Sequence, residues 1–234
     1  MKRIHRCAGP LSACFFATLL YTVVALSIRS PAEQEAVQRQ LGYLPPNFIC
    51  VSAWRGDGCE PVAIKTYPLN GGARRRQAKA AIEQLPIGTP FPTLYWLTCP
   101  EISKAVAEFE RKGYVRLFQE RLNADPLLAN RLIQCHQEYA DERWESLTLE
   151  DRSFLLEEDP SVQRMRNMMQ CSGISGTNFT AQDGHDDKPF VASIKCLHAH
   201  YAHYRSTMLS HVTPNPVGEM IHTQLEKEFP TLIL

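Results

Sequence analysis

The spacing of apolar and polar residues changes along the chain after residue 30, and these changes predict where helices and strands lie. Residues 32–41 are charged with a helical period, and Gly42 follows them as a residue type that ends helices. Residues 48–54 and 62–67 are rich in aromatic and β-branched types, with a Gly/Asp turn between them. They predict a hairpin. Residues 93–98, bounded by prolines, predict a third strand.

The remainder of the chain has helical periodicity. Helices are predicted over residues 101–112, 126–147, 191–209 and 217–229, and a further helix is predicted to begin after Asp159. Most of them start at a capping residue followed by proline, which suits the first helical position because its missing N–H has no helical partner there. The pattern therefore predicts an α+β fold, a mostly helical single domain with a small antiparallel β-sheet of about three strands.

The first 30 residues differ from the rest of the 234-residue chain. No acidic residue occurs before Glu33, and basic residues precede an apolar run over residues 11–28. This arrangement predicts a targeting leader or membrane anchor over residues 1–30, followed by one domain over residues 31–234. The segment is interpreted as a cleaved signal peptide, an uncleaved anchor or a mitochondrial presequence. The remaining alternative is that the start codon has been assigned too far upstream. The predicted location is accordingly membrane-associated or signal-bearing, with a mitochondrial alternative.

Composition narrows the classes of partner. Lys plus Arg and Asp plus Glu each number 25, so no net positive charge is present to attract a phosphate backbone, and nucleic acid is an unlikely partner. Eight cysteines without regular spacing do not resemble a small secreted disulfide framework and fit a reducing compartment. A membrane, through residues 11–28, and a protein partner stay open as predictions.

The richest candidate chemistry lies in residues 195–204, which contain one cysteine and three histidines. If this segment is helical, Cys196, His200 and His203 fall within roughly 60° of one another on one face. A thiol and two imidazoles suit Zn²⁺, or a nucleophile with its base. His198 projects away from this face and is a candidate for a substrate-facing role.

Cys99 is a second candidate, because it stands between the third predicted strand and a helix that begins with Pro100. At that position the positive end of the helix would favour the thiolate. Cys99 is therefore a candidate metal ligand or nucleophile, with a small buried residue as the alternative reading.

Two other residues near these motifs have simpler interpretations. We interpret His136, which stands beside Gln137 and Glu138, as a surface or helix-packing residue. Asn215 precedes Pro216 and can cap the helix that follows. If its side chain instead points into the cluster, it would orient a histidine or a bound water.

Six segments together resemble the mostly bacterial domain of unknown function family 501 (DUF501). They are residues 35–41, Cys59-Glu60-Pro61, residues 89–100, Gly173-Ile174-Ser175-Gly176, residues 195–204 and Asn215-Pro216-Val217-Gly218. The resemblance covers about residues 31–218 and implies no activity, because the family is uncharacterised. Residues 70–84 and 146–171 look like insertions relative to the family pattern. A cysteine often seen just before the position of Cys59 is absent.

These observations lead to a zinc site of unknown activity as the main hypothesis. The candidate ligands are Cys59, Cys99, Cys196, His200 and His203. In a structural site the first four would bind the metal, and His203 would contact these ligands without binding the metal itself. In a catalytic site three of the candidates would bind the metal and a water would occupy the fourth position.

Two other functions remain open. A metal-independent enzyme would use Cys99 as nucleophile with His200 or His203 as base. With the substrate-facing candidate His198 included, the catalytic candidates are Cys99, His198 and His203. A non-enzymatic partner-binding protein would use the same cluster as part of its core.

Overall fold

The β-hairpin and the third strand form where the pattern of β-branched residues predicts them. The computed structural model describes residues 30–56, 58, 60–69, 90–179, 191–210 and 212–233. All of these residues except Ser30 belong to one unit, residues 31–234. Strands β1 (Phe48–Trp54), β2 (Pro61–Thr66) and β3 (Tyr95–Leu97) form one antiparallel sheet in the order β1-β2-β3. The predicted α+β class with a small antiparallel sheet is confirmed.

Helices account for most of the described chain. They are α2 (Pro31–Leu41), α4 (Pro100–Arg111), α5 (Tyr114–Ala124), α6 (Pro126–Glu145), α7 (Leu149–Leu155), α8 (Pro160–Cys171), α9 (Leu197–Thr207) and α10 (Pro216–Glu228), with short 3-10 turns η2 (Ile174–Gly176) and η3 (Pro230–Leu232). Within these described segments, no helix is both long and apolar enough to cross a membrane. The apolar run over residues 11–28 lies outside the described residues.

The predicted caps are confirmed at the starts of three helices. Asp125 accepts hydrogen bonds from the first N–H groups of α6, Asp159 does so for α8, and Asn215 does so for α10. In each case proline occupies the first helical position. The side-chain oxygen satisfies backbone donors that have no partner inside the helix, which fixes the point where each helix begins.

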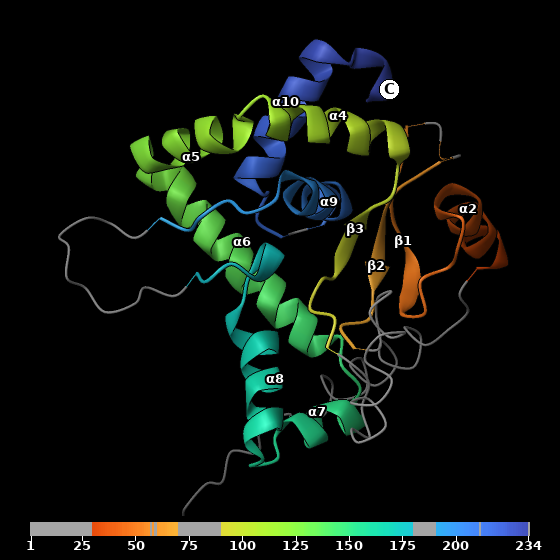
Figure 1. Cartoon of the computed structure of the whole chain (residues 1–234), viewed down its shortest axis with the longest axis vertical. Helices are drawn as coiled ribbons and strands as arrows, with labels where there is room; N and C mark the ends of the chain where they lie inside the picture. Colours follow the sequence, from red (N-terminus) through yellow and green to blue (C-terminus); the bar gives the residue numbers. More distant parts are fainter. Residues whose placement is uncertain are drawn as a thin grey trace, which may run out of the picture. The chain divides into compact units, whose positions relative to one another are not determined.

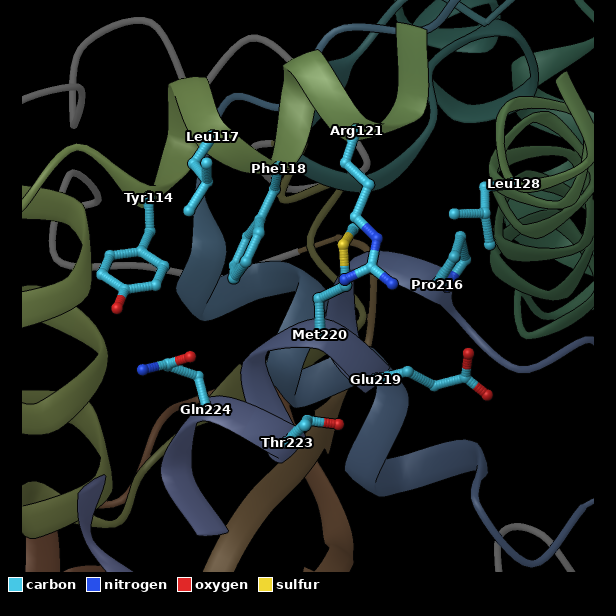
Figure 2. Close-up of a pocket in the computed structure, with 10 residues that line it drawn as sticks. All are labelled: Tyr114, Leu117, Phe118, Arg121, Leu128, Pro216, Glu219, Met220, Thr223 and Gln224. Atoms are coloured by element: carbon cyan, nitrogen blue, oxygen red, sulfur yellow. The ribbon is translucent and has the colours of Figure 1, made fainter. Parts of the chain in front are cut away.

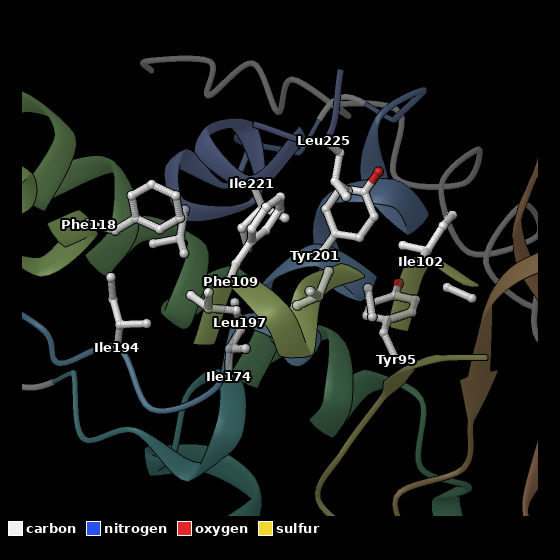
Figure 3. Packing of buried hydrophobic residues seen from close by; sticks show 14 of the residues in the cluster. Tyr95, Ile102, Phe109, Phe118, Ile174, Ile194, Leu197, Tyr201, Ile221 and Leu225 are labelled. Carbon is white, nitrogen blue, oxygen red and sulfur yellow. The ribbon is translucent and has the colours of Figure 1, made fainter. Parts of the chain in front are cut away.

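The sheet is packed on both faces, because its side chains alternate. Val51, Ile64 and Trp96 are aligned across the three strands and pack with Val37 of α2. The neighbouring row, with Ala53 paired to Ala63, belongs to the main core, which also contains the buried apolar side chains of α9. Figure 1 shows α9 next to the sheet, and Figure 3 shows Tyr201 of α9 among the other large side chains of this core. Helix α9 is therefore a central element, in contact with β2, β3, α4 and α10.

Helices α7 and α8 contribute to a second, smaller apolar cluster. Its buried members are Leu69, Leu147, Leu155, Val162, Met165 and Met169. Arg143 of α6 is fully buried beside this cluster, and its guanidinium donates to the carbonyls of Met169, Pro92 and Ser172. This side chain joins α6 to the end of α8 and to the segment before β3. Most of residues 146–171, predicted as an insertion, are thus helical and packed against the domain.

The N-terminal part of the helix predicted over residues 191–209 is wrong, since α9 begins only at Leu197. Cys196 has extended backbone angles, φ −154° and ψ 118°, and residues 191–196 are not helical. The reason lies in side chains from elsewhere in the chain. Gln119 accepts the N–H of Ile194 at 2.8 Å, and Glu110 accepts the N–H of Leu197 at 2.8 Å. Side-chain acceptors from other helices therefore bind these two N–H groups, which do not need a helical turn before Leu197.

Candidate functional site

Cys196 lies at the N-terminal cap of α9, next to two side chains that bear on its chemistry. One donor atom each from Cys196, His198 and Glu110 lie within 4.8 Å of one another. We call these three residues the Cys196 site. All three are partly buried, and the side chains of His198 and Glu110 are 26% and 31% exposed. Solvent therefore reaches the site.

Glu110 of α4 contacts both the backbone at the start of α9 and the side chain of His198. Its Oε1 atom accepts the N–H of Leu197 and lies 3.3 Å from Nδ1 of His198. The other ring nitrogen, Nε2, lies 3.0 Å from the carbonyl oxygen of Ser103. Both nitrogens of the ring thus face acceptors, an arrangement that favours the doubly protonated imidazolium.

The electrostatics of the site agree with this arrangement. The pKa of His198 is raised to about 9, chiefly by its interaction with Cys196 and further by Glu110 and the Ser103 carbonyl. Burial alone would raise the pKa of the Cys196 thiol, but His198 and the N–H of Ala199 outweigh burial, so this pKa is lowered. The imidazolium and the helix N-terminus both favour a thiolate.

His200 and His203 lie elsewhere on α9, fully buried and bound to a single asparagine. The amide nitrogen of Asn215 lies 3.2 Å from Nδ1 of each imidazole. The amide oxygen of Asn215 accepts the N–H groups of Val217 and Gly218, so the orientation of the amide is fixed. Asn215 therefore donates to both rings, and the proton of each neutral ring is placed on Nε2. The prediction that Asn215 caps the helix is confirmed, and its side chain also contacts the histidines, which the sequence analysis treats as an alternative to capping.

His136 of α6 belongs to the same buried region, so of its two interpretations the surface position is wrong and the packing role is confirmed. Its side chain is fully buried, and the centroid of its ring lies 5.7 Å from that of His200 and 6.0 Å from that of Phe179. The N–H of Ile174 donates to Nδ1 of His136 at 3.0 Å. Its sequence positions relative to the buried Leu132 and Tyr139 place it on the same helical face, and that spacing is the signal that marks it as buried.

Burial keeps all three of these histidines neutral. Burial lowers the pKa of His136 to about 3 and that of His203 to about 4, and it lowers the pKa of His200 well below its usual value. Their Nε2 atoms are buried without a hydrogen-bond partner in the described part of the chain. Because each Nδ1 accepts a hydrogen bond, each Nε2 carries the proton and has no lone pair for a metal.

Cys99 caps α4, as the sequence predicts, but its surroundings do not favour a thiolate. The thiol is buried and its Sγ lies 3.2 Å from a carboxylate oxygen of Glu101. Burial and this hydrogen bond raise the pKa of Cys99, although the backbone N–H of Ile102 and the charge of Arg55 act in the opposite direction. The expectation that the helix end makes Cys99 acidic is therefore wrong, because burial dominates.

The predicted ligands are distributed over separate places in the structure. In the described ranges, the groups of three or more His, Cys, Asp or Glu with donor atoms within 4.8 Å are the Cys196 site and the group of Glu60, Cys99 and Glu101. Neither contains His200 or His203, and Cys99 is not in the group of Cys196. Cys59 lies outside the described residues.

Glu110 is the member of the Cys196 site that the sequence analysis missed. It lies in the helix predicted over residues 101–112, where it looks like one charged residue among several. No local spacing connects residue 110 to residue 196. Its role depends on the packing of α4 against α9, which only the fold supplies.

Comparison with known proteins gives one match. A family model described as protein of unknown function (DUF501) matches residues 54–223. No curated protein and no solved structure matches the chain. The matched region runs from the end of β1 into α10, and it includes the Cys196 site and the histidines bound to Asn215.

Proposed function

The chain belongs to the DUF501 family, whose function is unknown, and we propose that it binds one zinc ion through Cys196, His198 and Glu110. The supporting observation is the gathering of a thiol, an imidazole and a carboxylate within 4.8 Å at the start of α9. These are the three side-chain types that bind zinc in proteins. The proposed set keeps Cys196 from the sequence prediction, moves His198 from a catalytic role to a ligand, and adds Glu110.

The spacing of the donor atoms supports zinc. In a tetrahedral site with bonds of about 2.0–2.2 Å, neighbouring nitrogen and oxygen ligands lie about 3.4 Å apart. Nδ1 of His198 and Oε1 of Glu110 lie 3.3 Å apart. A zinc ion could therefore replace the proton between these atoms without a large movement of either side chain.

The atoms around the ligands support the same assignment. A histidine that binds a metal through one nitrogen usually donates its other N–H to a carbonyl or carboxylate, which fixes the ring. Nε2 of His198 has the carbonyl of Ser103 at 3.0 Å for this purpose. Oε1 of Glu110 is likewise oriented by the N–H of Leu197.

Three protein ligands leave one tetrahedral position for water or substrate, as in catalytic zinc sites. When bound, zinc would supply Lewis acidity at that position. The chain's own contribution is to hold the ligands on two helices, α4 and α9, and to keep the site partly open to solvent. We therefore propose a catalytic type of site and not a structural one.

The experiment is elemental analysis of the full chain purified without a metal-binding tag. We expect about one zinc per chain, retained in Cys99→Ser and lost in Cys196→Ser. The two variants are matched, because each changes a cysteine that caps a helix, α4 or α9. Glu110→Gln should also lose zinc. Loss in Cys99→Ser with retention in Cys196→Ser would instead favour a site built on Cys99, and absence of metal from the unmodified protein would refute the zinc proposal.

A second function is supported by one observation, the lowered pKa of Cys196 beside the imidazolium of His198. We propose as the alternative that Cys196, and not Cys99, is the nucleophile of a metal-independent enzyme. In metal-free protein, iodoacetamide should then alkylate Cys196 faster than Cys99 at neutral pH, and His198→Gln should slow that reaction. Equal rates for the two cysteines would contradict this alternative.

A further inference from the structure

A groove lies between α5 and α10, away from the Cys196 site. Its volume is about 440 Å³, and apolar side chains from α5, α6 and α10 line it. Leu117 and Phe118 come from α5, Leu128 from α6 and Met220 from α10. Figure 2 shows Phe118 and Arg121 projecting from α5 toward Met220 on α10. The volume falls within the range of about 300–1,000 Å³ that is usual for small-molecule sites.

The charged residues at the groove are not equally compensated. Glu219 forms an ion pair with Arg131 at 2.7 Å. Beyond the end of the groove, Glu228 is paired with Lys112 at 3.0 Å and bonded to the Tyr114 hydroxyl at 3.1 Å. The guanidinium of Arg121, a residue within α5, has neither an ion pair nor a hydrogen bond with any residue that the structure describes. The uncompensated charge of the lining is therefore the positive charge of Arg121.

We propose that this groove binds a small amphipathic carboxylate, with its head on Arg121 and its aliphatic chain over Phe118 and Met220. A guanidinium matches a carboxylate because it can donate two parallel hydrogen bonds. The lining residues of α5 run from Tyr114 to Arg121, which corresponds to about 10 Å along the helix axis. That length suits a medium-chain aliphatic acid.

The chemistry of the walls favours this occupant over an extended peptide. Both walls are helices, whose backbone groups bond within the helix, so the groove has no free strand edge for a peptide to join. The lining is mostly apolar. Its polar side chains Thr223 and Gln224 are neutral, and Glu219 is paired with Arg131, so Arg121 carries the one uncompensated charge among the described lining residues. An aliphatic carboxylate presents the complementary pair of features, an apolar chain and one anion.

The test compares octanoate with octanol, which lacks the charge, by isothermal titration calorimetry on the full chain. We expect octanoate to bind roughly tenfold more tightly than octanol, because a hydrogen bond to a charged group is worth more than a neutral one. Arg121→Gln should abolish this difference and leave octanol binding unchanged. Met220→Ser should weaken both ligands.

Arg116→Gln is the matched control. Arg116 is also an exposed arginine of α5, it does not line the groove, and its partner is Glu120 at 3.8 Å. It should leave both affinities unchanged. The proposal is overturned if neither ligand binds, if octanol binds as tightly as octanoate, if Arg121→Gln keeps the preference, or if Arg116→Gln removes it as completely as Arg121→Gln. Circular dichroism of each variant verifies that it is folded.

Discussion

Acid should destabilise this protein strongly, because three buried histidines are held neutral. His136, His200 and His203 have lowered pKa values in the fold, and burial is the largest cause for each. In the unfolded chain the same groups titrate near their usual pKa of 6.5. Between these values the unfolded state binds more protons than the folded state, so stability is full above pH 6.5 and decreases as the pH falls below it.

The magnitude follows from the pKa shifts. Because the folded pKa of His203 is about 4, lowering the pH from 7 to 5 should reduce the free energy of unfolding by about 2 kcal/mol through this residue. His136, with a folded pKa of about 3, should cost about as much again, and His200 acts in the same direction, so the total loss is at least about 4 kcal/mol. That is comparable with the total stability of a small domain, about 5–15 kcal/mol. His198 acts in the opposite direction, because its raised pKa stabilises the fold below pH 6.5 and this contribution is lost as the pH rises through about 9.

The assay is urea unfolding of the full chain at pH 7, 6 and 5, followed by circular dichroism and extrapolated to water. His203→Gln should shrink the loss between pH 7 and pH 5 by about 2 kcal/mol, whatever its effect at pH 7. His198→Gln is the control, and it should enlarge that loss slightly. An unchanged pH dependence in His203→Gln would refute the reasoning that His203 is neutral in the fold.

Two further predictions concern the region around these histidines. Asn215→Ala should destabilise the protein by about 3 kcal/mol, since it removes a helix cap and leaves two buried ring nitrogens without a hydrogen-bond donor. Thermal unfolding would measure this loss. Asn215→Asp, which keeps the cap but not the donor, should lose only part of that stability. Gly173→Ala should cost about 1–3 kcal/mol, because an added Cβ would lie 2.4 Å from Nδ1 of His136. Its effect should shrink in a His136→Ala background, and additivity of the two substitutions would contradict the predicted clash.

The elements that the sequence predicts well are those fixed by neighbouring residues. An Asp or Asn followed by proline determines a helix start through its own side chain, so the starts of α6, α8 and α10 are correct. The strands agree because their side chains suit a sheet packed on both faces. Helices α5 and α7 have no counterpart in the prediction. The left-handed Gly113, φ +84°, ends α4 and permits α5 to begin immediately after it.

The start of α9 shows why the candidate site could be predicted only in part. Cys196 continues a helical pattern in the sequence, but Glu110 binds the N–H of Leu197 from a helix far away in the chain. Residue spacing carries no information about such a contact. The predicted stripe of Cys196, His200 and His203 therefore separates into a partly buried cap and a fully buried pair.

This separation explains how one short helix holds histidines of opposite character. His198 stands in the first turn of α9, where Glu110 and the Ser103 carbonyl both accept from its ring, and it is cationic near neutral pH. His200 and His203 lie deeper on the same helix, where Asn215 donates to both rings, and they are neutral. Asn215 also caps α10, so the neutral pair fixes α10 against α9. The buried pair thus belongs to the framework of the fold, whereas the Cys196 site, where we propose the chemistry, lies at the partly exposed start of α9.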